Sequence, residues 1–112
     1  MYSIVAVMAN SQNELELYRA VNSLEKAAET KNIEIKVEIQ EYPLTYGRLS
    51  KEDVSASTVA ILTGDMPIAD AERFADIPVF RTLTTAIASD PHSVIAAAME
   101  KASLYAEPTA VF

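Results

Sequence analysis

Two apolar runs mark the strands predicted to lie at the centre of the fold. Tyr2 to Met8 is a β-branched apolar run, and Val59-Ala60-Ile61-Leu62 forms a second, shorter one. Continuous apolar runs of this length are typical of strands that are buried on both faces. We therefore predict that these two segments are the inner strands of a sheet.

Between and after these strands, the spacing of apolar residues predicts helices. From Asn13 to Asn32, apolar side chains recur every three or four residues, and polar side chains occupy the opposite face. The apolar stripe consists of Leu17, Val21, Leu24 and Ala28. Three further helices are predicted from their starts. Ser50 resembles a cap for a helix that ends near Ala56, Pro67 opens one that ends near Phe74, and Asp90-Pro91 opens the last.

Two other segments read as outer strands. Ile33 to Ile39 alternates apolar residues with Glu34, Lys36 and Glu38, which predicts a half-exposed edge strand. Ile77 to Phe80 contains Pro78, which also places it at an edge. Strands that alternate with helices form parallel sheets. We therefore predict an α/β, Rossmann-like fold with a four-stranded parallel sheet in the order 2-1-3-4 and helices on both faces.

Composition narrows the class of protein. The chain has 112 residues and 50% apolar content, which fits one domain, here predicted over residues 1–104. Tyr105 to Phe112, with Pro108, reads as the start of a linker. A net charge of −7 with nine scattered Lys and Arg residues argues against nucleic-acid binding. The N-terminal apolar run is too short to cross a membrane, so we expect no direct membrane insertion by this domain.

The absence of cysteine removes disulfides, thiolate metal sites and thiol nucleophiles. Glu14, Glu16, Asp65 and Asp70 have no His or Cys residue in their company, so they do not read as a metal site. We expect no cofactor. The candidate site is the carboxyl end of the two inner strands, at Ala9 to Asn13 and Gly64 to Met66, because ligands of doubly wound sheets bind there.

Several segments resemble the fructose-specific IIB family of the bacterial phosphotransferase system, over nearly the whole chain. The strand Ile4-Val5-Ala6-Val7 and the helix segment Leu24-Glu25-Lys26-Ala27-Ala28 match family segments at the expected distance. The match continues through Ile35 to Glu41, Leu49 to Asp53, Val59 to Leu62, Asp65, Arg73-Phe74 and Pro78-Val79. Several such matches in register are hard to obtain by chance.

The chain departs from the family where the chemistry would occur. The family has a Cys-Pro-Thr-Gly loop with a nearby histidine. By this resemblance, its phosphorylated cysteine falls on Asn10, Pro-Thr-Gly on Ser11-Gln12-Asn13, and the histidine on Glu16. An asparagine amide is neither nucleophilic nor ionisable near neutral pH. Glu14 and Glu16 would also repel an incoming phosphate dianion.

The resemblance therefore implies a cysteine-less, IIB-prime type of domain with a docking role. Its expected partners are the phosphoryl-donor protein (IIA- or HPr-like) and the neighbouring active IIB and membrane IIC domains of a fructose permease. The expected location is cytoplasmic, at the inner face of the membrane. The binding residues implied by this reading are Asn10, Ser11, Gln12, Asn13, Glu14, Glu16 and Asp65.

Two alternatives remain open. The domain could be an atypical phosphocarrier that uses Ser11 or the single histidine, His92, although no base is visible beside Ser11 and His92 sits at a predicted helix start. It could also be a free-standing regulatory module that binds a small anion or a transcriptional partner. Asp65 is interpreted as a turn or cap residue rather than a phosphoryl acceptor, and the segment Tyr42 to Tyr46 as an apolar loop.

Overall fold

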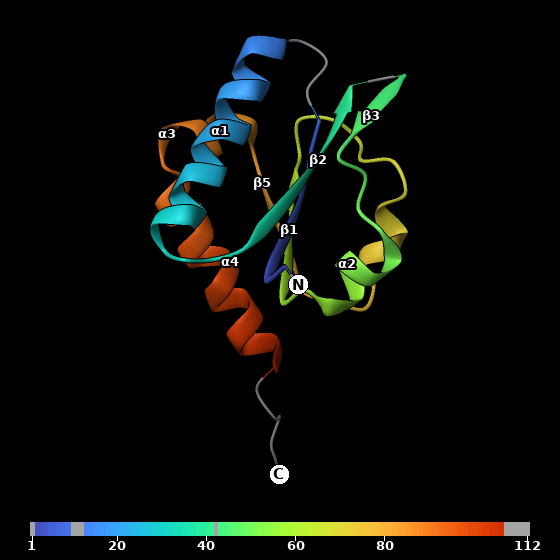
Figure 1. Cartoon of the computed structure of the whole chain (residues 1–112), viewed down its shortest axis with the longest axis vertical. Helices are drawn as coiled ribbons and strands as arrows, with labels where there is room; N and C mark the ends of the chain where they lie inside the picture. Colours follow the sequence, from blue (N-terminus) through green and yellow to red (C-terminus); the bar gives the residue numbers. More distant parts are fainter. Residues whose placement is uncertain (1, 10–12, 42, 107–112) are drawn as a thin grey trace.

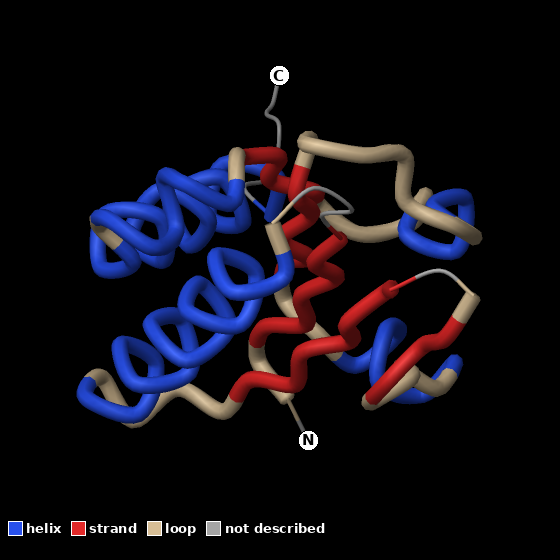
Figure 2. Tube along the Cα trace, turned by 90° about the horizontal axis from the view of Figure 1, so that it is seen from above, coloured by secondary structure: helices blue, strands red, loops and turns tan. Residues whose placement is uncertain are grey.

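A five-stranded sheet forms the middle layer of the computed structural model, which describes residues 2–9, 13–41 and 43–106. Helices cover both of its faces (Figure 1 and Figure 2). The strands are β1 (Ile4–Ala9), β2 (Ile35–Glu41), β3 (Leu44–Tyr46), β4 (Val59–Thr63) and β5 (Val79–Thr82). The helices are α1 (Glu14–Thr30), α2 (Lys51–Ala56), the 3₁₀ helix η1 (Ala71–Phe74), α3 (Thr84–Ser89) and α4 (Pro91–Ala106).

The strand order is β3-β2-β1-β4-β5. The four strands predicted from the sequence lie parallel in the predicted order, and β1 and β4 are fully buried along their length. The prediction of an all-parallel sheet is wrong, because β3 pairs antiparallel with β2 and makes the sheet mixed. The α/β class is confirmed, and the strand order places the switch point beside β1, as predicted.

The β2–β3 hairpin corrects two further predictions. β2 is not an edge strand, because β3 lies outside it. The segment interpreted as an apolar loop contains a strand at 44–46, while Tyr42 lies outside the described residues. Gly47 follows β3 with a φ of +66°, and a Cβ there would lie 2.7 Å from the carbonyl oxygen of Val37. Glycine therefore permits the close approach with which the hairpin ends.

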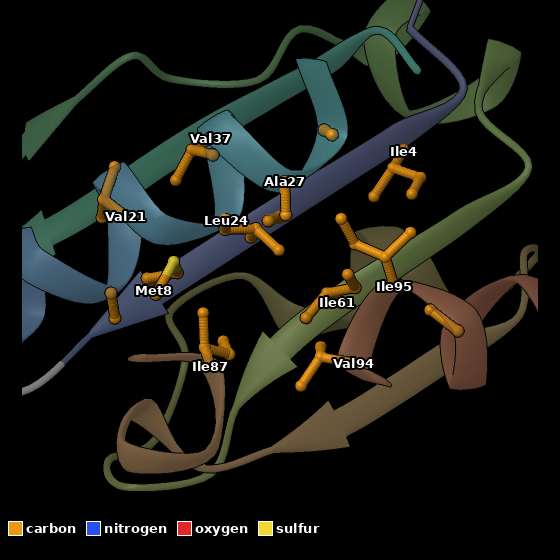
Figure 3. Packing of buried hydrophobic residues seen from close by; sticks show 14 of the residues in the cluster. Ile4, Met8, Val21, Leu24, Ala27, Val37, Ile61, Ile87, Val94 and Ile95 are labelled. Carbon is orange, nitrogen blue, oxygen red and sulfur yellow. The ribbon is translucent and has the colours of Figure 1, made fainter. Parts of the chain in front are cut away.

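Two hydrophobic clusters hold the layers together, one on each face of the sheet. The larger cluster joins β1 and β4 to α1, α3 and α4, with Leu24, Ile61 and Ile95 fully or almost fully buried (Figure 3). The smaller one lies under α2 and η1 and contains Val54 and Phe74. The predicted stripe of α1 is confirmed, since Leu17, Val21, Leu24 and Ala28 are all buried.

The predicted helix starts are correct in two of three cases. Ser50 and Asp53 form a reciprocal capping box for α2, and α4 begins at Pro91. The helix predicted from Pro67 is wrong in length, because only Ala71–Phe74 is helical there. The short helix α3 was not predicted. Tyr105 and Ala106, predicted as linker, still belong to α4, and residues 107–112 lie outside the described residues.

None of the described helices has both the length and the apolar character that crossing a bilayer requires.

Candidate functional site

The carboxyl ends of β1 and β4 are joined by the side chain of Thr63. Its hydroxyl accepts a hydrogen bond from the backbone N–H of Ala9 (2.9 Å) and donates one to the Ala9 carbonyl (3.3 Å). Thr63 is fully buried and Ala9 is nearly so. These bonds continue the β1–β4 pairing past Val7 and Leu62, where the parallel ladder ends. They fix the point at which the chain leaves β1 for the candidate loop.

The other end of that loop is fixed by Asn13. Its side chain caps α1 by accepting a hydrogen bond from the backbone N–H of Glu16 at 3.0 Å. Glu14 and Glu16 occupy the first turn, where negative charge is favourable to the helix dipole. Asn10, Ser11 and Gln12, predicted as binding residues, lie outside the described residues.

Asp65 is the predicted site residue on the neighbouring loop. Its carboxylate accepts hydrogen bonds from the backbone N–H (2.8 Å) and the hydroxyl (2.7 Å) of Thr84. Thr84 is the first residue of α3 and is fully buried. Asp65 thus acts as a cap that ties the β4 loop to α3. The structure therefore brings Asp65 to the same end of the sheet as Ala9, but engages its carboxylate within the fold.

A shallow groove opens beside Ala9 at this end of the sheet. It has a volume of about 430 Å³ and is bounded by the β2–β3 hairpin and the β4–η1 loop. Its lining is mostly apolar and includes Ala9, Pro43, Leu44, Met66, Pro67 and Ala69. A groove of this kind suits an apolar side chain better than a phosphate group.

A buried ion pair supports the hairpin on the face of the sheet that carries the groove, because Gln40 lines the groove and bonds the same carboxylate. Glu38 of β2 is fully buried, and both its carboxylate oxygens accept hydrogen bonds from the Arg73 guanidinium, at 3.0 and 2.7 Å. The N–H of Leu49 and the amide of Gln40 donate to it as well. Burial raises the pKa of Glu38, but the bonds from Arg73, Leu49 and Gln40 outweigh it and hold the pKa below its usual range.

Sequence reasoning missed this pair. The alternation of Ile33 to Ile39 predicted that Glu38 faces solvent, whereas the loop at Leu49 and η1 cover it. The Gln40 side chain also bonds the backbone of Ala69 in both directions, at 2.9 and 3.2 Å. Glu38 thus holds η1 and the loop at Leu49, and Gln40 holds the β4–η1 loop that bounds the groove.

Tyr18 links α1 to the end of β2. Its hydroxyl donates a hydrogen bond to the carboxylate of Glu41. That bond, with burial and the nearby charges of Glu41, Tyr46 and Glu14, raises the pKa of Tyr18 to about 12. The contact places α1 and the hairpin side by side near the candidate loop.

His92 lies apart from these contacts in sequence and in its surroundings. His92 is exposed at the second position of α4. The nearby carboxylate of Asp90 accepts hydrogen bonds from the backbone N–H and the hydroxyl of Ser93. Within the described ranges, no three His, Cys, Asp or Glu side chains gather as a metal ion would require.

Comparison with known proteins identifies the fold and its family. Residues 18–97 match the family model described as "PTS system, Lactose/Cellobiose specific IIB subunit". The chain belongs to the phosphotransferase-system IIB family. The PTS system fructose-like EIIB component 2 of Escherichia coli K12 is 38% identical over 81 residues, which are 72% of this chain and 76% of the relative.

This IIB domain is similar in structure to solved fructose-type IIB domains. A predicted fructose-specific IIB from Escherichia coli has a TM-score of 0.83 and 30% identity, covering 92% of this chain and 91% of that one. A domain of the fructose-specific IIABC component of Borrelia burgdorferi has a TM-score of 0.82 and 26% identity, covering 89% and 94%. The recognition of a fructose-like IIB domain without cysteine is therefore confirmed.

The Thr63 hydroxyl gives a testable prediction for this IIB domain. Thr63→Val keeps the shape of the side chain but leaves the buried N–H of Ala9 without its acceptor, which costs about 1–3 kcal/mol of unfolding free energy. Chemical denaturation measures the loss, and amide hydrogen exchange at Ala9 should accelerate. Thr45→Val, on the exposed edge strand β3, is the matched control and should change stability little. Equal stability of Thr63→Val and wild type would contradict the assignment.

Proposed function

We propose that this IIB domain is a non-catalytic, IIB-prime type of module in a fructose-like phosphotransferase component. The observation that carries the proposal is the asparagine at position 10, where the family has its phosphorylated cysteine, in a chain without any cysteine. Phosphoryl transfer from a phosphohistidine needs a nucleophile, and an amide supplies none. The fold is kept while the acceptor is replaced.

The flanks of the loop support the same conclusion. In a phosphate cradle, backbone N–H groups at a helix N-terminus hold the dianion. Here the N–H of Glu16 is taken by Asn13, and Glu14 and Glu16 add negative charge to the first turn of α1. These features disfavour a bound dianion, so a single change at position 10 would not restore a carrier site.

A docking role fits what remains of the site. A domain that binds the phosphoryl-donor protein (IIA- or HPr-like) raises the effective concentration of that donor beside an active IIB domain and the membrane IIC domain. The inferred docking surface is the carboxyl end of the sheet: Ala9, Asn13 to Glu16, and Gly64 to Pro67. We infer a location at the cytoplasmic face of the membrane on the same grounds. Glu14 and Glu16 would pair with Lys or Arg of the donor.

Titration of the ¹⁵N-labelled domain with the donor protein tests this role. Chemical shift changes should cluster on Ala9, Asn13 to Glu16 and Gly64 to Pro67, and binding should weaken as salt is added. Reversing both charges, in Glu14→Lys with Glu16→Lys, should weaken binding about tenfold. Glu25→Lys with Glu29→Lys, farther along α1, is the matched control. Shifts confined to the opposite end of the sheet, or none at high donor concentration, would refute the docking role.

A further inference from the structure

The hairpin carries the sheet beyond the helices that cover it. On the face of the sheet that α1 covers, this helix packs against β1 and β2. The outermost strand, β3, pairs only with β2. A helix is about 10 Å wide and neighbouring strands lie about 4.8 Å apart, so one helix covers about two strands. On this face the helical layer therefore ends at α1, and β3 lies beyond it at the edge of the sheet (Figure 2).

The side chains of β3 that lie on the α1 side of the sheet are apolar. Tyr46 lies opposite Ile39 in the β2–β3 register and Leu44 lies opposite Glu41, so both share the α1 side of the sheet. Leu44 is 56% and Tyr46 46% exposed, and Leu15 of α1 is 62% exposed. We call this surface the β2–β3 face. It consists of Leu15, Tyr18, Ile35, Ile39, Leu44 and Tyr46.

A groove continues the β2–β3 face along α1. Tyr18, Asn22, Glu25 and Glu29 are spaced to lie on one stripe of the helix. The last three of these line a groove of about 690 Å³ between α1 and the start of β2, together with Ile33 and Ile35. The groove and Tyr18 of the β2–β3 face therefore lie along the same stripe of α1.

The charges around the β2–β3 face and the groove have one dominant sign. Five glutamates border these two surfaces, and one lysine, Lys26, lines the groove. The glutamates are Glu14, Glu25, Glu29, Glu34 and Glu41. Apolar side chains flanked by carboxylates match an apolar stripe flanked by Lys or Arg.

We propose that the β2–β3 face binds a basic amphipathic helix of a protein partner, which lies alongside α1 and completes the helical layer. Its apolar stripe covers Tyr46, Leu44 and Ile39, and its Lys or Arg side chains meet the glutamates. This surface adjoins the docking surface proposed at the loop after β1 and shares Glu14 and Leu15 with it, whereas Leu44, Tyr46 and the groove along α1 lie outside that docking surface. A second copy of the chain fits poorly, because a two-fold contact would set these carboxylates against one another.

A capped peptide of about 15 residues, with leucines at helical spacing and lysines elsewhere, is the probe. Titrated into the ¹⁵N-labelled domain, it should give saturable shifts at Ile39, Leu44 and Tyr46. The same peptide with every lysine replaced by glutamate should bind at least about tenfold more weakly. Absence of saturable binding, or shifts only at the carboxyl-end loop, would overturn the proposal.

Substitutions distinguish binding at the β2–β3 face from binding at the docking surface. Leu44→Lys with Tyr46→Lys should lower peptide affinity about tenfold or more, and Glu25→Lys with Glu29→Lys should lower it as well. Leu104→Lys, which adds the same charge at an exposed leucine of α4, should have little effect. Equal affinity of all variants, or a dimer that depends on Tyr46 in sedimentation experiments, would refute it. Donor docking should survive the Glu25 and Glu29 changes, so the two proposals fail independently.

Discussion

Replacing Arg73 with methionine should lower the unfolding free energy of the domain by about 3–5 kcal/mol. The substitution leaves the fully buried Glu38 carboxylate without the cation that offsets its desolvation. The remaining donors, the Leu49 N–H and the Gln40 amide, cannot neutralise the charge. Because Glu38 also anchors the loop at Leu49, the hairpin and η1 should loosen together. Denaturant titration, with hydrogen exchange at Leu49, measures both effects.

Arg48→Met provides the matched control. Arg48 pairs with Asp70 at 3.3 Å, but both side chains are more than half exposed, at 63% and 54%. Exposed pairs of this kind contribute about 0–1 kcal/mol. The two substitutions remove the same side chain chemistry, so their difference isolates burial. A loss for Arg73→Met as small as that for Arg48→Met would show that Glu38 is not a buried, compensated charge.

The contribution of Glu38 to the unfolding free energy should change with pH in opposite directions in the wild type and in Arg73→Met. In the wild type, the pKa of Glu38 lies below its ordinary value of 4.5, so its stabilising contribution is present above that value and is lost as pH falls through the folded-state pKa. Without Arg73, burial raises the pKa, and the neutral acid becomes the favoured folded form. The difference in unfolding free energy between the wild type and Arg73→Met should therefore be largest near neutral pH and should become smaller toward about pH 4.

The parallel core of the fold follows from local patterns. β1 and β4 are continuous apolar runs, and α1 has a clear apolar stripe. Asp90-Pro91 predicts a helix start because a capping carboxylate precedes a proline at the first helical position. Each signal lies within the element that it specifies. The family resemblance placed the same elements in the same order, and the comparisons agree with it.

The features that sequence reasoning missed depend on contacts between distant residues. Three residues of β3 are too few to show a period, and their pairing is set by the approach of Gly47 to Val37. Glu38 appears solvent-facing by alternation, because its partner Arg73 lies 35 residues away. The helix α3 has weak helix formers at its start and is held by Asp65, 19 residues earlier. Gly47 was the one local signal of a tight hairpin end.

The candidate site was predictable as a location rather than as a set of contacts. The switch-point rule placed it at the loops after β1 and β4, and the capping roles of Asn13 and Asp65 lie there. The bond from Thr63 to Ala9 was not predictable, because a buried threonine at a strand end has no sequence pattern of its own. The roles proposed for Asn10, Ser11 and Gln12 stay predictions, since those residues lie outside the described ranges.

Phosphoryl transfer to the domain should not occur at all, which is the largest functional difference expected from an active family member. Asn10 offers no nucleophile, and Asn10→Cys alone should restore little phosphorylation. By the family resemblance, Asn13 stands in place of the cradle glycine and Glu16 in place of the histidine, so a thiol at position 10 would lack both supporting groups. A cysteine-bearing IIB domain of fructose type is the positive control for the wild-type domain and for Asn10→Cys.

Intact-mass spectrometry after incubation with phosphoenolpyruvate and the phosphoryl-donor proteins tests the absence of carrier chemistry most directly. The wild-type domain should keep its unmodified mass while the control IIB domain gains a phosphoryl group under the same conditions. Stoichiometric phosphorylation of the wild-type domain would contradict the account. Loss of that modification in Ser11→Ala or His92→Ala would then identify the acceptor and establish an atypical phosphocarrier.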